Sequence, residues 1–91
     1  MFSNLISYTN DIETTLYGKK LILKNLYQYV GPLTMQYLPY GGIQMIINGQ
    51  MVISTNLGYL ATKEVEYDGV NYTINEFIQR FSNLVNLVLP N

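Results

Sequence analysis

Residues 43–54 read IQMIINGQMVIS, two apolar runs separated by Asn48-Gly49. Asn-Gly readily adopts the positive φ angles of a type I′ turn, so this stretch predicts a β-hairpin with a two-residue turn. The expected faces are Ile43, Met45, Ile47 and Val52 on one side and Ile46, Met51 and Ile53 on the other. Both faces are apolar, and a hairpin of this kind has to be covered on both. We therefore expect a helix on one face and another segment or a second subunit on the other.

A second hairpin is predicted at residues 64–72, where Asp68-Gly69 supplies the turn. Side chains alternate between the two faces of a strand, so pairing Tyr67 with Val70 fixes which residues share a face. The apolar face holds Val65, Tyr67, Val70 and Tyr72, and the polar face holds Glu64, Glu66 and Asn71. This pattern is typical of a half-buried hairpin with one face in water.

After this hairpin, apolar residues recur at the three- and four-residue spacing of an amphipathic helix. They are Ile74, Phe77, Ile78, Phe81, Leu84, Val85 and Val88. Thr73 is in position for the N-cap, and Glu76 completes a capping box. Tyr72 is placed to pack on Phe77 across that cap. Leu87 and Leu89 fall off the apolar stripe, so we expect them to be free to contact a partner.

The first third of the chain allows two interpretations. Apolar residues between positions 2 and 17 fit a helical stripe, whereas the threonines in the same stretch favour strands at 5–8 and 12–17. Further along, the apolar spacing over 23–30 predicts a short helix, ended by the Gly-Pro pair that follows it. Residues 31–42 are rich in Pro and Gly and are expected to form an irregular connection.

These elements fit a single domain over residues 1–91, long enough for one core. The predicted fold is α+β: a small antiparallel sheet of about four strands, with hairpins at Asn48-Gly49 and Asp68-Gly69, packed by the C-terminal amphipathic helix. The uncovered second face of the sheet indicates a homodimer or a higher oligomer. No run of about 18 apolar residues predicts a membrane span, and no leader pattern opens the chain, so a cytoplasmic location is expected.

The composition argues against catalysis and against metal or cofactor binding. The chain has no Cys and no His, so it lacks thiolate nucleophiles, the commonest general base and the commonest transition-metal ligands. Glycine motifs for phosphates or dinucleotides are also absent. Glu64, Glu66 and Asp68 form a short acidic row, which we interpret as a solvated strand face. We therefore expect no enzyme activity, no catalytic residue, no metal site and no cofactor.

Charge is scarce and nearly balanced. Asp, Glu, Lys and Arg make up 12% of the residues, roughly half the usual share, and the net charge is −1. Nucleic-acid binding needs several basic residues on one face, and the five in this chain are too few and too scattered. Lys19, Lys20 and Lys24 are close in sequence and are the candidates for a weak contact with a phosphate group. The favoured interpretation of these three lysines is a solvated hairpin end.

From Asn25 through Thr62 the chain contains no charged residue. Interface cores are depleted in charge and enriched in Tyr and Met, so this stretch predicts a partner-binding surface, with core plus uncharged loops as the alternative. Tyrosine suits recognition because it combines a large contact area, few rotatable bonds and a polar tip. The candidate partner-binding residues are Tyr29, Tyr37, Tyr40, Met45, Met51 and Tyr59.

We expect a small non-enzymatic binding protein that has a protein partner and also associates with itself. Asn, Ile and Tyr are abundant, whereas Ala and Arg each occur once, a bias that A/T-rich genomes produce. The leading hypothesis is therefore an accessory protein of a virus or phage, acting in the host cytosol, that inhibits a host defence protein by direct binding. The alternatives are a structural or assembly subunit of a virion or other homo-oligomer, and an oligomeric sponge for a nucleotide-like small molecule.

Overall fold

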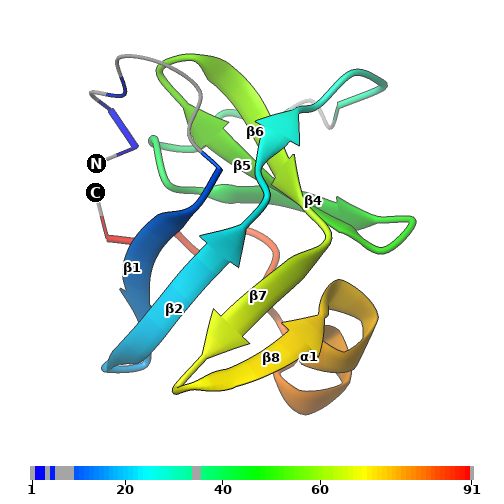
Figure 1. Cartoon of the computed structure of the whole chain (residues 1–91). Coiled ribbons are helices and arrows are strands. Elements are labelled where there is room, and N and C mark those ends of the chain that lie inside the picture. The colour runs from blue at the N-terminus through cyan, green and yellow to red at the C-terminus, as the bar shows by residue number, and fades with distance from the viewer. Residues whose placement is uncertain (1, 4, 6–9, 34–35, 91) are drawn as a thin grey trace.

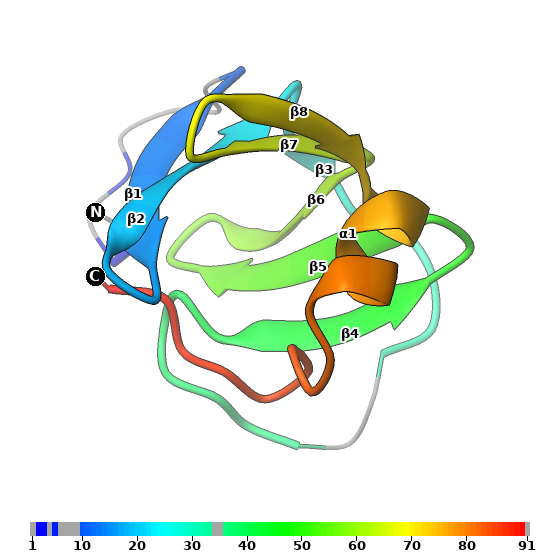
Figure 2. The same cartoon turned by 90° about the horizontal axis from the view of Figure 1, so that it is seen from below.

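The computed structural model describes residues 2–3, 5, 10–33 and 36–90. Its strands and helix are β1 (Ile12–Leu16), β2 (Lys19–Lys24), β3 (Tyr27–Gln28), β4 (Ile43–Ile47), β5 (Gln50–Thr55), β6 (Gly58–Thr62), β7 (Glu64–Tyr67), β8 (Val70–Thr73) and α1 (Ile74–Arg80). Two four-stranded antiparallel sheets result, sheet A in the order β1-β2-β7-β8 and sheet B in the order β3-β6-β5-β4. They lie as two layers with α1 beside them (Figures 1 and 2). An antiparallel α+β fold is confirmed, but the expectation of one sheet of about four strands is wrong.

Two continuous runs of chain pass from one sheet into the other. β2 leads into β3 through residues 25–26, and β6 leads into β7 through Lys63 alone. Because β2 pairs with β7 and β3 pairs with β6, both runs bend together where the sheets meet. The hydroxyl of the buried Thr62 lies 2.5 Å from the carbonyl oxygen of Lys24 and 2.7 Å from that of Glu64. It therefore ties the two bent runs together.

The predicted short helix over 23–30 is wrong, because this stretch contains the first of these bends. Leu21 and Leu23 both point into the core with the period of a strand, and β2 pairs on both sides, with β1 and with β7. Pairing on two sides outweighs the weak helical spacing of the sequence.

In the N-terminal third, the structure has a strand at β1, whose side chains alternate between buried and exposed. The strand considered at 5–8 lies mostly outside the described residues.

Both predicted hairpin turns are present. The φ angles of Asn48 and Gly49 are 53° and 74°, and those of Asp68 and Gly69 are 51° and 83°, as a type I′ turn requires. The second hairpin has the expected register, with Tyr67 opposite Val70, so its predicted polar and apolar faces are confirmed. Turn chemistry alone was therefore enough to fix the pairing of β7 with β8.

The faces of the first hairpin differ from the prediction at one residue. Met45 pairs with Val52 on the outer face of sheet B, as expected. A register shift between Ile43 and Met45 turns Ile43 toward the core, where it lies opposite Ile53 instead of sharing a face with Met45. One extra residue in a strand reverses the faces on either side of it, so the expectation for Ile43 is wrong.

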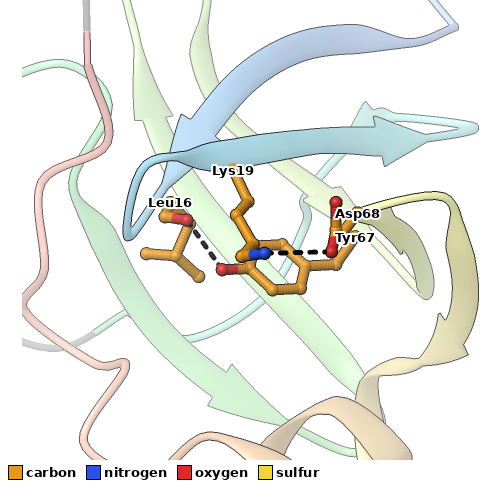
Figure 3. A network of polar contacts seen from close by, with 4 residues as sticks. All are labelled: Leu16, Lys19, Tyr67 and Asp68. Atoms are coloured by element: carbon orange, nitrogen blue, oxygen red, sulfur yellow. Dashed lines mark hydrogen bonds and ion pairs between the residues drawn. The ribbon is translucent and has the colours of Figure 1, made fainter.

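The hydrophobic core lies between the two sheets and draws on both ends of the chain. Its buried members are Phe2, Ile12, Leu16, Leu21, Leu23, Leu26, Ile43, Met51, Ile53, Leu60, Val65, Tyr67, Ile74, Phe77, Leu84 and Leu89. The buried hydroxyl of Tyr67 donates to the carbonyl oxygen of Leu16 at 2.8 Å (Figure 3). This bond satisfies the buried phenol of Tyr67 and links β7 to the end of β1.

The start of α1 matches the prediction. The Thr73 side chain accepts from the N–H of Glu76, and the Glu76 carboxylate accepts from the N–H of Thr73, which confirms the capping box. The rings of Tyr72 and Phe77 lie 5.7 Å apart between centroids, as expected for packing across the cap. Among the described residues, no helix is both long and apolar enough to cross a membrane.

The predicted continuation of the helix to Val88 is wrong. α1 ends at Arg80, and the φ angles of Asn83 and Asn86, 59° and 79°, redirect the chain. Asn adopts such left-handed conformations more easily than most residues do. Residues 84–90, here called the closing segment, leave the helix and run beside β4 (Figure 2).

The closing segment bridges the two sheets on one side of the sandwich. The N–H of Leu89 donates to the Gly41 carbonyl oxygen just before β4 at 2.8 Å, and the Thr14 hydroxyl of β1 donates to the Pro90 carbonyl oxygen at 3.3 Å. Gly41 is required here, because a Cβ on it would lie 2.5 Å from the Leu89 carbonyl oxygen. Leu89 is 1% exposed, so the expectation that it is free to contact a partner is wrong, whereas Leu87 is half-buried.

Candidate partner-binding surface

Tyrosine side chains cover the outer face of sheet B. Val52 and Ala61 are fully buried on this face, and Met45 is 9% exposed. The aromatic residues that pack against them are Tyr27, Tyr29 and Tyr59. The segment that the sequence required for the second apolar face of the hairpin therefore belongs to this chain. The apolar hairpin by itself gives no reason for self-association.

Two of the six candidate partner-binding residues are not accessible in the folded chain. Met51 is 0% exposed and points into the core between the sheets, and Met45 lies beneath the tyrosines of sheet B. The structure therefore does not place either methionine among the exposed candidate residues. Methionine in an apolar strand suits a core as well as an interface, and the sequence could not separate the two.

The most exposed large apolar side chains lie between β3 and β4. Residues 29–40, here called the contact loop, include Tyr37 at 98% exposure and Val30 at 89%. Leu33 and Tyr40 are 39% and 44% exposed. Residues 34 and 35 of the loop lie outside the described residues. The loop thus holds three of the predicted contact residues, and two of them, Tyr37 and Tyr40, are exposed.

Both ends of the contact loop are fixed to sheet B. At its start, the N–H of Tyr29 donates to the Tyr59 carbonyl oxygen at 2.8 Å, and the Tyr29 hydroxyl donates to the Pro32 carbonyl oxygen at 2.9 Å. At its end, the N–H of Gly42 donates to the Pro39 carbonyl oxygen within a turn, also at 2.9 Å, and the N–H of Gly41 donates to the carbonyl oxygen of Ser54 in β5 at 2.8 Å. Tyr29 and Tyr59, both candidate contact residues, are half-buried and serve here as anchors.

A buried amide holds the middle of the loop. Gln44 of β4 is 0% exposed, and its side-chain nitrogen donates to the Gln36 carbonyl oxygen at 2.7 Å. The side-chain nitrogen of Gln36 in turn donates to the side-chain oxygen of Asn86 at 2.5 Å. The loop is therefore tied to β4 and to the closing segment. A loop that is already fixed loses less conformational entropy when it binds than a free one would.

The tyrosines of the sequence draw attention to Tyr37 and Tyr40 of this loop but not to Val30, which is 89% exposed. Val30 follows the last bond of the loop to β6, and Gly31-Pro32 follows Val30. A proline has no N–H to donate, so the chain cannot continue as a paired strand past this point. That Gly-Pro signal could have indicated that Val30 lies beyond the end of the sheet.

The side chains of the three candidate phosphate-contact lysines do not come together at one site. Lys19 forms an ion pair with Asp68 at 3.3 Å, between the two hairpin turns of sheet A (Figure 3). Lys20 and Lys24 lie on the opposite face of β2, about 13 Å apart at the usual rise of a strand. The Lys24 ammonium lies 3.9 Å from Glu66. The three side chains therefore offer no common phosphate site.

A small polar pocket lies where the two sheets meet. Its volume is about 380 Å³, and it is lined by Lys24, Asn25, Tyr27, Lys63, Glu64 and Thr73. Burial raises the pKa of the Tyr27 hydroxyl above its ordinary value, and the neighbouring Tyr29 raises it further. The Lys63 ammonium lies 5.8 Å from the centre of the Tyr27 ring, and the Glu64 carboxylate accepts from Asn25. The pocket therefore holds both positive and negative side chains, and each of these already contacts another residue of the chain.

Acidic groups are spread out in the described part of the chain. No three His, Cys, Asp or Glu residues lie close enough together there to hold a metal ion. Glu64 and Glu66 occupy the outer face of sheet A, as the predicted solvated strand face requires. The feature that the structure brings together most clearly is thus the anchored, uncharged contact loop.

No protein family, no curated protein and no solved structure matches this chain.

Proposed function

We propose that this chain is a small non-enzymatic binding protein that contacts a protein partner through the contact loop. In this proposal it is an accessory protein of a virus or phage, and it inhibits a host defence protein by covering part of its surface. The viral origin rests on the amino-acid bias of the chain, and the mode of action rests on the loop.

One observation carries the binding proposal: Tyr37 and Val30 are almost fully exposed on a loop that is fixed at both ends and in the middle. Exposed apolar groups on a mobile loop would collapse onto the protein, whereas the anchors keep these two in water. Exposure of apolar side chains to water is unfavourable, and a partner that buries them removes this free-energy cost. The absence of charge from Asn25 through Thr62 suits the centre of a protein interface.

The test is affinity capture from host lysate followed by native mass spectrometry, with the wild type compared with Tyr37→Ala and Val30→Asp. Val70→Asp is the matched control, because Val70 is 51% exposed but lies in the β7–β8 hairpin. Truncation of a central aromatic anchor costs about 2–4 kcal/mol, so we expect both loop variants to lose the partner at least about 30-fold. Equal capture by the loop variants and the control would refute the proposal.

A second candidate function is an assembly subunit, and a separate apolar surface favours it. Tyr17 is 59% exposed and its ring lies 6.0 Å from that of Phe81, while Val88 nearby is 47% exposed. Two different apolar surfaces are what head-to-tail assembly needs. Analytical ultracentrifugation would detect association that depends on concentration and that Tyr17→Ser removes. A wild-type chain that stays monomeric at high concentration would exclude the assembly role.

A further inference from the structure

β4 has backbone groups that no other strand of the described residues uses. It is the last strand of sheet B, and its two-residue turn makes Ile47 pair with Gln50 through hydrogen bonds. In an antiparallel ladder such bonded pairs alternate with unbonded ones, so Ile46 directs its N–H and C=O away from β5. None of the hydrogen bonds found between the loops and the strands of the described residues reaches these two groups.

An apolar groove adjoins the same residue. Its volume is about 510 Å³, and Ile46 forms one wall. The other lining residues come from α1 and the turn after it: Ile78, Phe81, Ser82, Asn83, Leu84 and Val85. Ile78 and Val85 are 39% and 40% exposed, so the groove is open to solvent. No charged side chain lines it.

The chain itself shows which kind of segment this edge accepts. Three residues before Ile46, the N–H of Ile43 donates to the Leu87 carbonyl oxygen at 2.7 Å, and the N–H of Asn86 donates to the Ile43 carbonyl oxygen at 2.9 Å. The closing segment thus pairs with the start of β4 in an antiparallel direction. After a turn at Val85-Asn86, residues 87–89 run alongside β4, and no residue of the closing segment is charged. Its pairing ends where the groove begins, so the second half of the same edge remains open.

We propose that the Ile46 edge and its groove bind an extended, uncharged apolar segment of a partner protein. The segment adds a strand to β4 through the N–H and C=O of Ile46, and it places an apolar side chain between Ile78 and Val85. Main-chain bonds supply the affinity in such strand addition, and the pocket beside the edge selects the side chain. A charged side chain would be buried there without a partner, so the segment is uncharged at this position. No described residue of the contact loop lines this site.

The test is an NMR titration of the isotope-labelled chain with the peptide acetyl-Thr-Val-Ile-Val-Thr-amide, a neutral strand-forming probe. We expect saturable shifts at the amide of Ile46 and at the methyl groups of Ile78 and Val85, together with slower hydrogen exchange of the Ile46 N–H. Val85→Asp places a charge in the groove and should weaken binding about tenfold or more. Val30→Asp, on the contact loop, should leave the affinity unchanged.

The outcomes separate this site from its alternatives. If Val85→Asp loses its fold by circular dichroism, Ile78→Glu on the exposed side of α1 takes its place. An unchanged affinity in a folded groove variant, or shifts centred outside the groove, would overturn the proposal. A peptide that gives no saturable shift at millimolar concentration would overturn it too. A dimer of this chain that Val85→Asp dissolves would assign the edge to a second copy, and would overturn the proposed occupant.

Discussion

Replacing Leu89 with Ala tests whether the closing segment is a strand that completes the core. Leu89 is 1% exposed and belongs to the main core, whereas its neighbour Val88 is 47% exposed. A buried Leu→Ala change costs about 2–5 kcal/mol through lost burial and the cavity left behind. Taking about 3 kcal/mol, we expect Leu89→Ala to lower the melting temperature by about 12–24 °C in a domain of this size.

Val88→Ala is the matched control, because it removes methyl groups from the adjacent position of the same segment. Roughly half of the Val88 side chain is already in water, so the change should cost less than about 1 kcal/mol. The helical stripe of the sequence predicts the reverse order, with Val88 inside and Leu89 outside. Thermal unfolding followed by circular dichroism decides between them. A cost for Val88→Ala equal to or above that for Leu89→Ala would refute the strand geometry of the closing segment.

Three further predictions concern positions outside the closing segment. Gly42→Ala should cost about 1–3 kcal/mol in urea unfolding, because its Cβ would lie 2.5 Å from that of Leu38; a neutral effect would mean that the contact loop is not held there. Thr73→Ala should cost about 1 kcal/mol through loss of the N-cap, and Thr73→Ser should restore most of it. The raised pKa of Tyr27 means that its contribution to stability is complete below about pH 10 and is lost as the pH rises through the folded-state pKa. The stability advantage of the wild type over Tyr27→Phe should therefore shrink at alkaline pH in unfolding titrations, and a constant advantage would contradict the shift.

Local chemistry predicted the turns and the cap correctly. Each of these features depends on a few neighbouring residues and can be read from a short stretch of sequence: Asn48-Gly49, Asp68-Gly69 and the Thr73 cap. The end of α1 depends instead on distant backbone. Residues after Arg80 keep a helical spacing of apolar side chains, but hydrogen bonds to Gly41 and Ile43 hold residues 86–89 against the start of β4. Tertiary pairing of this kind cannot be detected in the spacing of apolar residues along the sequence.

The candidate surface was predictable only in part for a related reason. Low charge and abundant tyrosine located the contact loop, but they could not separate exposed residues from covered ones. Tyr37 and Met51 fit the same compositional rule, yet one is 98% exposed and the other is fully buried. Which face of β5 points inward is set by the second sheet, and which tyrosines act as anchors is set by the path of the loop. Neither follows from composition.

The position of Gly41 has a consequence for how this protein is made in a cell. The ring of Phe2 and the backbone of Leu89 both approach Gly41, so the core needs residues from near the beginning and near the end of the chain. During synthesis the apolar strands β4 and β5 emerge before the closing segment, which pairs with the start of β4. Until Leu89 has left the ribosome, these strands are exposed to other nascent chains, and unpaired apolar strands readily aggregate. The core is therefore expected to form only after Leu89 has emerged, and the yield of folded protein should depend on chaperone capacity.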